Sequence, residues 1–194
     1  MTQETVELLP EVLKKFSNCT LCKASRDDTN REAMCDSRLQ VIDFDKIPNE
    51  YARGRGWDGV PKSNDALYID ILGKWYFIEF KNGSEIHKDE VYRKLYDSLI
   101  MLLEWKIIPD FEFIRNNINY ILVYNEGKHD KIPKAPARDL NYGYFFERAQ
   151  KEKRLWGIDK FEKYLFSETH TYTKNEFEEK FVRPKEIEEG IAPS

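Results

Sequence analysis

The chain has 194 residues, of which 41% are hydrophobic and 14% aromatic, with nine Gly and eight Pro. This length favours one domain over residues 1–194, and the composition excludes a mainly disordered chain because it can build a packed core. The 31 basic and 35 acidic side chains give a net charge of −4, which excludes binding of nucleic acid by bulk positive charge. Any contact with nucleic acid must therefore be local.

The sequence carries no sign of a membrane or an oxidising compartment. No stretch approaches the roughly 20 apolar residues that cross a bilayer, and the N-terminus lacks the basic start and apolar centre of a secretory signal. We therefore expect a cytoplasmic protein with no membrane contact. Cys19, Cys22 and Cys35 form an odd, sparse set, which favours reduced thiols. Zinc is the weaker alternative, because a fourth ligand would have to be a distant residue such as His87.

The first elements are short and weakly marked. A helix is predicted to open at Pro10, where the missing N–H does no harm and apolar residues follow at helical spacing. Residues 17–46 show little periodicity, although residues 39–44 are either a short strand or a buried loop. The segment Arg53–Gly59 is rich in glycine and arginine, and it is predicted to be a flexible, positively charged loop.

The most regular patterns occupy the middle of the chain. Ala66–Leu72 and Trp75–Phe80 are rich in β-branched and aromatic residues and flank Gly73-Lys74, which predicts a β-hairpin. The apolar period then changes to about 3.6, which predicts a helix of four or five turns that Pro109 ends. Ile118–Tyr124 is almost continuously apolar, as in a buried strand, and the strand–helix–strand order predicts parallel pairing.

The last third of the chain is predicted to be mostly helical. Glu126–Asp139 indicates an exposed basic loop, and Phe145–Leu155 and Ile158–Phe166 have the mixed faces of helices. Thr173–Glu176 has the pattern of a capping box that opens a last short helix. The tail after Arg183 is acidic and is expected to fray.

Three charged residues at the hairpin ends are the candidates for chemistry. Asp65 begins the first strand, and Glu79 and Lys81 lie two apart near the end of the second, so these two side chains leave the same face. Glu-x-Lys occurs four times in the chain, but this copy lies on an apolar strand, where charge is costly. Two neighbouring carboxylates repel each other unless a cation lies between them, and such hard oxygen ligands suit Mg²⁺ or Mn²⁺.

Asn64-Asp65 and Glu79-Phe80-Lys81, together with the helix–strand–strand–strand–helix–strand order, resemble the PD-(D/E)XK nuclease superfamily, and its small resolvase-like members above all. Asn64 stands where the family has proline. The resemblance covers residues 8–125 and implies an α/β fold with a mixed central sheet and a restriction-endonuclease-like αβββαβ core. A helical C-terminal extension over about residues 140–183 would follow this core.

The resemblance also implies roles for individual residues. Asp65, Glu79 and the backbone carbonyl of Phe80 would hold Mg²⁺ or Mn²⁺, and Lys81 would position or activate the attacking water. The family often adds a glutamate from its first helix, for which Glu11 is the better match and Glu7 the second.

The parity of the hairpin leaves one assignment open. With a two-residue turn at Gly73-Lys74, Asp70 rather than Asp65 would share the face of Glu79 and would be the metal ligand. A three-residue loop or a bulge would restore Asp65, which we prefer because it lies at the mouth of the strand. Asp70 would then be a buried structural partner.

Basic and aromatic residues outside the hairpin are candidates for contact with nucleic acid. Arg53, Arg55 and Lys62 could grip phosphates while Trp57 stacks on a base, and Lys88 begins the long helix near the site. Each of them also fits a solvated surface.

The expected function is a metal-dependent nuclease that hydrolyses phosphodiester bonds, in DNA ahead of RNA. A homodimer would suit an enzyme that cuts both strands. The alternative is a non-catalytic binding or regulatory module that retains the nuclease scaffold, and the negative net charge keeps that alternative open.

Overall fold

The structure is a computed structural model that describes residues 1–27, 32–128 and 155–192. Its centre is a six-stranded mixed sheet with the order β1-β4-β5-β6-β7-β8. The strands are β1 (Cys19–Thr20), β4 (Gln40–Asp43), β5 (Ala66–Ile69), β6 (Trp75–Lys81), β7 (Ile118–Tyr124) and β8 (Thr169–Thr173). Pairing is antiparallel from β1 to β6 and parallel from β6 to β8. The molecule is therefore α/β with a mixed sheet, as the sequence predicts.

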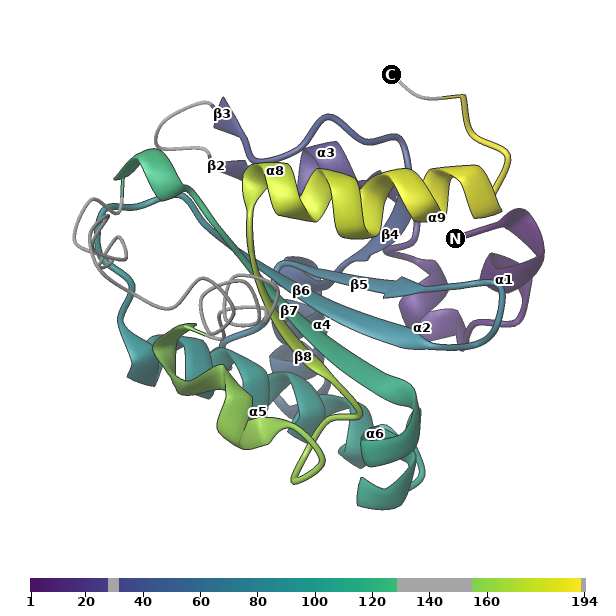
Figure 1. The fold of residues 1–194 in the computed structure, drawn as a ribbon. Coiled ribbons are helices and arrows are strands. Elements are labelled where there is room, and N and C mark those ends of the chain that lie inside the picture. The colour runs from purple at the N-terminus through teal and green to yellow at the C-terminus, as the bar shows by residue number, and fades with distance from the viewer. Residues whose placement is uncertain (28–31, 129–154, 193–194) are drawn as a thin grey trace, which may run out of the picture.

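Helices cover both faces of this sheet (Figure 1). α5 (Lys88–Glu104) packs along one face. The other face is covered by a continuous helical segment made of α8 (Lys174–Phe177), a π-helical turn η4 (Glu178–Val182) and α9 (Arg183–Glu188). The alternation of β6 explains this layering, because Phe80 packs against Phe177 at 5.7 Å between ring centroids while Glu79 and Lys81 face α5.

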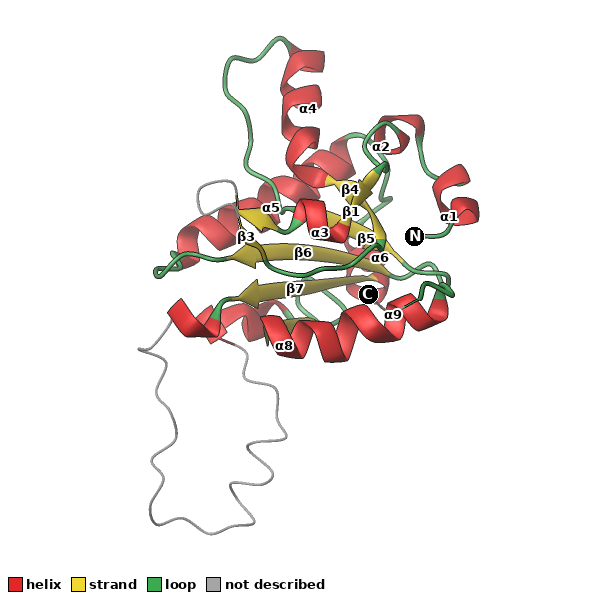
Figure 2. Cartoon of the chain, turned by 90° about the horizontal axis from the view of Figure 1, so that it is seen from above, coloured by secondary structure: helices red, strands yellow, loops and turns green. Residues whose placement is uncertain are grey.

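Shorter elements surround these layers (Figures 1 and 2). They are α1 (Gln3–Glu7), α2 (Glu11–Lys14), α3 (Leu21–Ala24), the small ribbon of β2 (Arg26–Asp27) and β3 (Glu32–Ala33), η1 (Phe44–Lys46), α4 (Ile47–Arg55), α6 (Phe111–Asn117), η2 (Glu126–Lys128) and η3 (Leu155–Phe161). None of the helices in the described ranges has the length and apolarity needed to cross a membrane.

The hairpin of β5 and β6 closes with a three-residue loop. Ile69 pairs with Trp75, and Asp70 N–H donates to the Lys74 carbonyl at 2.9 Å, which leaves residues 71–73 in the loop. Gly73 takes the left-handed conformation at φ 76°, as such loops require. The two-residue turn at Gly73-Lys74 is therefore wrong, and the alternative register is the one observed.

Two segments before and after the hairpin differ from the sequence prediction. Arg53 and Arg55 lie in the last turn of α4, so the predicted flexible loop begins only at Gly56. Pro48 at the start and Gly56 in the left-handed conformation at the end delimit this helix, whose weak apolar pattern hid it. Residues 39–44 resolve into strand β4 and the first residue of η1, which decides between the strand and the buried loop.

The C-terminal part is less helical at first, and more helical at its end, than predicted. Ile158–Phe166 is not an α-helix, because η3 ends at Phe161 and a β-bridge joins Glu162 to Phe166. β8 was not predicted, since its Thr-rich sequence has little apolar character although it pairs with β7. The capping box at Thr173 is confirmed. The expected fraying after Arg183 is wrong as far as Glu188, because α9 buries Glu186 against Ser37.

The remaining predictions fare as follows. β7 spans Ile118–Tyr124 and all its residues are buried, which confirms the buried parallel strand. The long helix is confirmed as α5, although it ends at Glu104, before Pro109. The predicted helix at Phe145–Leu155 and most of the basic loop Glu126–Asp139 lie outside the described residues.

Candidate active site

The observed register brings Asp65 next to Glu79. Ala66 pairs with Ile78, so the preceding residue of β5 and the following residue of β6 are Asp65 and Glu79. Asp65 Oδ2 accepts the backbone N–H of Phe80 at 2.6 Å, which holds this carboxylate at the mouth of the hairpin. The two acids of the motif therefore lie on adjacent strands and on the face that α5 covers.

Glu79 is the deepest member of the cluster, with no exposed surface. Its Oε1 lies 2.7 Å from Lys94 Nζ and 3.1 Å from Lys81 Nζ. Its Oε2 is buried and has no hydrogen-bond partner among the described residues. An unpaired buried carboxylate oxygen costs free energy, so this atom is available to a proton or a cation.

Lys94 on α5 joins the two carboxylates and was not predicted. Its Nζ also lies 3.0 Å from Asp65 Oδ1, and its side chain is 14% exposed. The sequence did contain a signal, because Lys94 lies three residues after Val91 and four before Ser98, on the buried stripe of the helix. A lysine on such a stripe requires a buried partner.

The environment shifts the ionisation of both groups. Burial, and then the charge of Asp65, raises the pKa of Glu79 to about 8. Burial lowers the pKa of Lys94, but Asp65 and Glu79 more than offset this effect and raise it overall. Lys94 is thus a permanent cation, and it partly compensates the negative charge of the two acids.

Lys81 stands between the buried carboxylate and solvent. Its ammonium contacts Glu79 on its own strand and Glu90 Oε1 on α5, both at 3.1 Å. Lys81 also lines an open pocket of about 160 Å³, together with Asp65 and its own chain neighbours Phe80 and Asn82. Asp65 and Lys81 therefore meet at a surface hollow, and Glu79 lies buried behind them.

Asp45, from η1, lines the same pocket and is a second residue that sequence reasoning missed. Phe44 N–H donates to the Asp65 carbonyl at 3.1 Å, and Ser63 Oγ donates to Asp45 Oδ1 at 3.1 Å, which brings this carboxylate near Asp65. The pKa of Asp45 is raised to about 6, first because the surrounding protein removes water from the carboxylate and then because of the charge of Asp65. The residue nevertheless keeps exposed surface in the pocket. An acid after an apolar run was its signal in the sequence.

The structure does not bring the other acids proposed as metal ligands to this cluster. Glu11 is exposed and pairs with Lys14, and Glu7 is exposed on α1. Asp70 lies at the opposite end of β5, where Oδ1 accepts the N–H groups of Leu72 and Lys74 at 2.9 Å. The assignment of Asp70 as a ligand is therefore corrected, because its carboxylate closes the hairpin loop.

The residues proposed for nucleic acid are spread over one end of α4, the following loop and α5. Arg53 pairs with Glu50, and Arg55 pairs with Glu104 while lying 3.8 Å over the Tyr51 ring. Trp57 and the side chains of Lys62 and Lys88 are exposed. Lys62 N–H donates to Asp97 Oδ2 of α5 at 2.9 Å, which ties this loop to the helix that carries Lys94.

Among the residues that the structure describes, the three cysteines do not form a metal site, whereas the acidic side chains have the donor chemistry for one. Cys19, Cys22 and Cys35 are free thiols, and burial raises the pKa of Cys35 to about 12. Within the described ranges, no group of three or more His, Cys, Asp or Glu side chains is arranged as a metal centre. The donor chemistry of Asp65, Glu79 and Asp45 nevertheless suits a hard divalent cation, and Glu79 Oε2 has no hydrogen-bond partner in the part of the chain that the structure describes.

Comparisons with family models, with curated proteins and with solved structures returned no match for this chain. The chemistry of the cluster rests on its own geometry.

Proposed function

We propose that the protein is a metal-dependent nuclease that hydrolyses phosphodiester bonds, with DNA ahead of RNA as the substrate. The observation that carries this proposal is the register that sets Asp65 beside Glu79, with Lys81 on the same face at the edge of an open pocket. β4, β5, β6, α5 and β7 have the order and pairing that a restriction-endonuclease-like core requires, which supports the finer fold assignment.

Asp65, Glu79 and the Phe80 carbonyl, with Asp45 beside them, would hold Mg²⁺ or Mn²⁺. The bound cation would supply polarisation of the phosphodiester and of the attacking water. Lys81 faces the pocket, where its ammonium would bind a phosphate oxygen and neutralise charge that develops during hydrolysis. Lys94 and a bound cation would both favour the ionised form of Glu79, which burial disfavours in the cation-free protein.

A hydrolysis assay tests this proposal. Single-stranded DNA, duplex DNA and RNA of one sequence are incubated with the protein in Mg²⁺, in Mn²⁺ and in EDTA. We expect cleavage with either cation and none in EDTA. Glu79→Gln and Lys81→Met should lower the rate by orders of magnitude, because they remove groups that act on the transition state.

A matched control comes from another copy of the motif. Glu178 and Lys180 also form a Glu-x-Lys pattern, but they lie in η4 on the opposite face of the sheet. Glu178→Gln and Lys180→Met should cut at the parent rate. The nuclease assignment fails if Glu79→Gln cuts as fast as the parent.

A second candidate is a binding or regulatory module that keeps the scaffold without hydrolysis. Lys94 favours it, because its ammonium lies within 3.0 Å of both carboxylates and partly compensates their charge without a metal. This candidate predicts that calorimetry detects no Mn²⁺ binding, and that nucleic acid binds but is not cut in Mn²⁺.

A further inference from the structure

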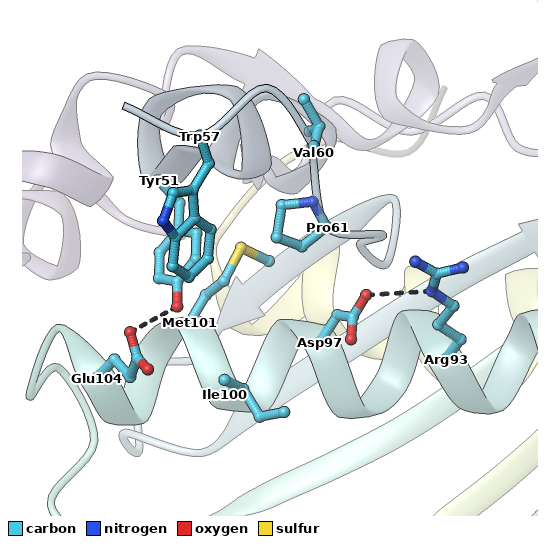
Figure 3. Close-up of a pocket in the computed structure, with 10 residues that line it drawn as sticks. Tyr51, Trp57, Val60, Pro61, Arg93, Asp97, Ile100, Met101 and Glu104 are labelled. Atoms are coloured by element: carbon cyan, nitrogen blue, oxygen red, sulfur yellow. Dashed lines mark hydrogen bonds and ion pairs between the residues drawn. The ribbon is translucent and has the colours of Figure 1, made fainter. Parts of the chain in front are cut away.

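A second cavity, larger than the catalytic pocket, lies between α5 and the segment that follows α4 (Figure 3). Its volume is about 390 Å³. Trp57 and Tyr51 form one wall, Val60 and Pro61 form the opposite one, and Met101 and Ile100 of α5 form the floor.

The apolar walls of this cavity remain open to solvent. The exposed fractions are 53% for Trp57, 49% for Ile100 and 47% for Val60. Trp57 meets Tyr51 edge to face at 5.8 Å, which fixes the indole ring while leaving much of its surface uncovered. An exposed aromatic side chain that is held in this way is suited to stacking against a flat ligand.

The charged groups at the rim are already paired. Tyr51 donates its hydroxyl to Glu104 at 2.5 Å, Arg55 pairs with the same Glu104, and Arg93 lies 3.6 Å from Asp97. The rim is therefore nearly neutral and does not suit a phosphate group. It suits a neutral, flat group with polar edges, since the carboxylate oxygens can accept N–H groups from those edges.

The cavity and the catalytic cluster share one loop and one helix. The loop that leaves the cavity is tied to α5 by Lys62 N–H on Asp97 and by Asn64 N–H on Ser98 Oγ at 3.0 Å, and it continues directly into Asp65. Along α5, Lys94 and Met101 are seven residues apart. This spacing is about 10 Å, or roughly three nucleotide rises.

We infer that this cavity binds an unstacked nucleobase from a single-stranded segment of the substrate, a few nucleotides from the bond that is cut. The inference rests on the proposed function, because the nucleic acid reaches the cavity from the catalytic pocket. The base enters through the neutral rim. The exposed side chains of Arg53 and Lys62 lie outside the rim, where they can contact the phosphate backbone of the nucleic acid.

The probe is a single-stranded DNA oligonucleotide that carries one 2-aminopurine, titrated with the full chain in EDTA so that no bond is cut. We expect binding to quench the fluorescence. Trp57→Ala should weaken binding by about 5- to 150-fold, because stacking on an aromatic side chain contributes about 1–3 kcal/mol per base. Trp57→Phe should retain most of the affinity.

Two further variants separate the pocket from a general effect on folding. Ile100→Trp fills the cavity from an exposed helical position and should weaken binding while the thermal midpoint is kept. Phe111→Ala removes an aromatic ring of similar exposure from α6 and should bind as the parent does. The inference is overturned if neither Trp57→Ala nor Ile100→Trp changes the dissociation constant.

The outcomes also separate this inference from the proposed nuclease activity. If the protein cleaves DNA and Trp57→Ala binds the oligonucleotide as tightly as the parent, the base pocket is rejected and the nuclease proposal stands. Quenching that depends on Trp57 without cleavage in any cation rejects hydrolysis and supports the pocket. If the parent self-associates and Ile100→Trp abolishes this without changing the affinity for the oligonucleotide, the cavity binds a second copy of the chain. That result overturns the inference.

Discussion

Lys94 partly compensates the negative charge of the acidic cluster of Asp65 and Glu79. Its ammonium contacts Asp65 and Glu79, and its side chain is largely shielded from water. Lys94→Met keeps the length of the side chain but removes the ammonium group that pairs with the two acids. In EDTA we expect a loss of about 3–5 kcal/mol in the free energy of unfolding, measured with urea, because breaking a buried ion pair strands the partner charge.

The same variant should respond more strongly to Mn²⁺ than the parent does, since a divalent cation replaces the missing charge. If Mn²⁺ raises the thermal midpoint of both proteins equally, Lys94 does not compete with the cation for these carboxylates.

Glu79 makes the stability of the cation-free protein depend on pH. Its pKa is raised from an ordinary 4.5 to about 8, so the folded protein keeps a proton that the unfolded chain releases between these values. The stabilisation is complete below about pH 4.5 and is lost as the pH rises through about 8. We expect the free energy of unfolding in EDTA to fall over this window, by at most about 1.4 kcal/mol per pH unit from this group.

Glu79→Gln cannot ionise and should lack this part of the slope. The slope that remains comes from other groups, including Asp45, whose pKa is also raised. The measurement is urea unfolding of the parent and of Glu79→Gln at pH 5, 6.5 and 8. If the unfolding free energy of both proteins changes equally with pH, Glu79 does not keep a proton in the folded state.

At the scale of an element, Asp70 is the residue that closes the β5–β6 hairpin. Its carboxylate accepts two loop N–H groups and pairs with Lys185 of α9 at 2.9 Å. Asp70→Ala should lower the free energy of unfolding by about 3 kcal/mol, because these donors lose a charged acceptor. Asp70→Asn keeps an acceptor oxygen and should lose less.

The same pair of variants distinguishes a structural acid from a metal ligand. Calorimetry with Mn²⁺ should give the parent affinity for Asp70→Asn and a much weaker one for Asp65→Asn. Equal weakening in both would return Asp70 to the site.

At the scale of the molecule, the C-terminal helical segment completes the core on the face of the sheet away from Asp65 and Glu79. Phe181 is buried and packs against Tyr68, Tyr76 and Phe177. Phe181→Ala should cost about 3–5 kcal/mol in unfolding free energy, as large-to-small core substitutions do. Ile187→Ala, at an exposed site on α9, should cost less than about 0.5 kcal/mol.

Because Phe181 lies across the sheet from Asp65, the folded fraction of Phe181→Ala should cut DNA at the parent rate per molecule. A rate that falls further than the folded fraction would show that the two faces are coupled.

The sequence by itself determined the elements whose local pattern is strong. β6, α5 and β7 have clear periods, and Glu79 and Lys81 share a face because the strand period is two. The capping box at Thr173 is equally local. By contrast, β8 has little apolar pattern, and it is a strand because β7 offers it a parallel partner.

The tertiary structure decided what depends on partners distant in the chain. The three-residue loop placed Asp65 rather than Asp70 beside Glu79, and packing of α5 on the sheet inserted Lys94 between the two acids. Glu11 was left on the surface with Lys14. Register and burial are set by contacts across the whole core, so neighbouring residues in the sequence carry little information about them.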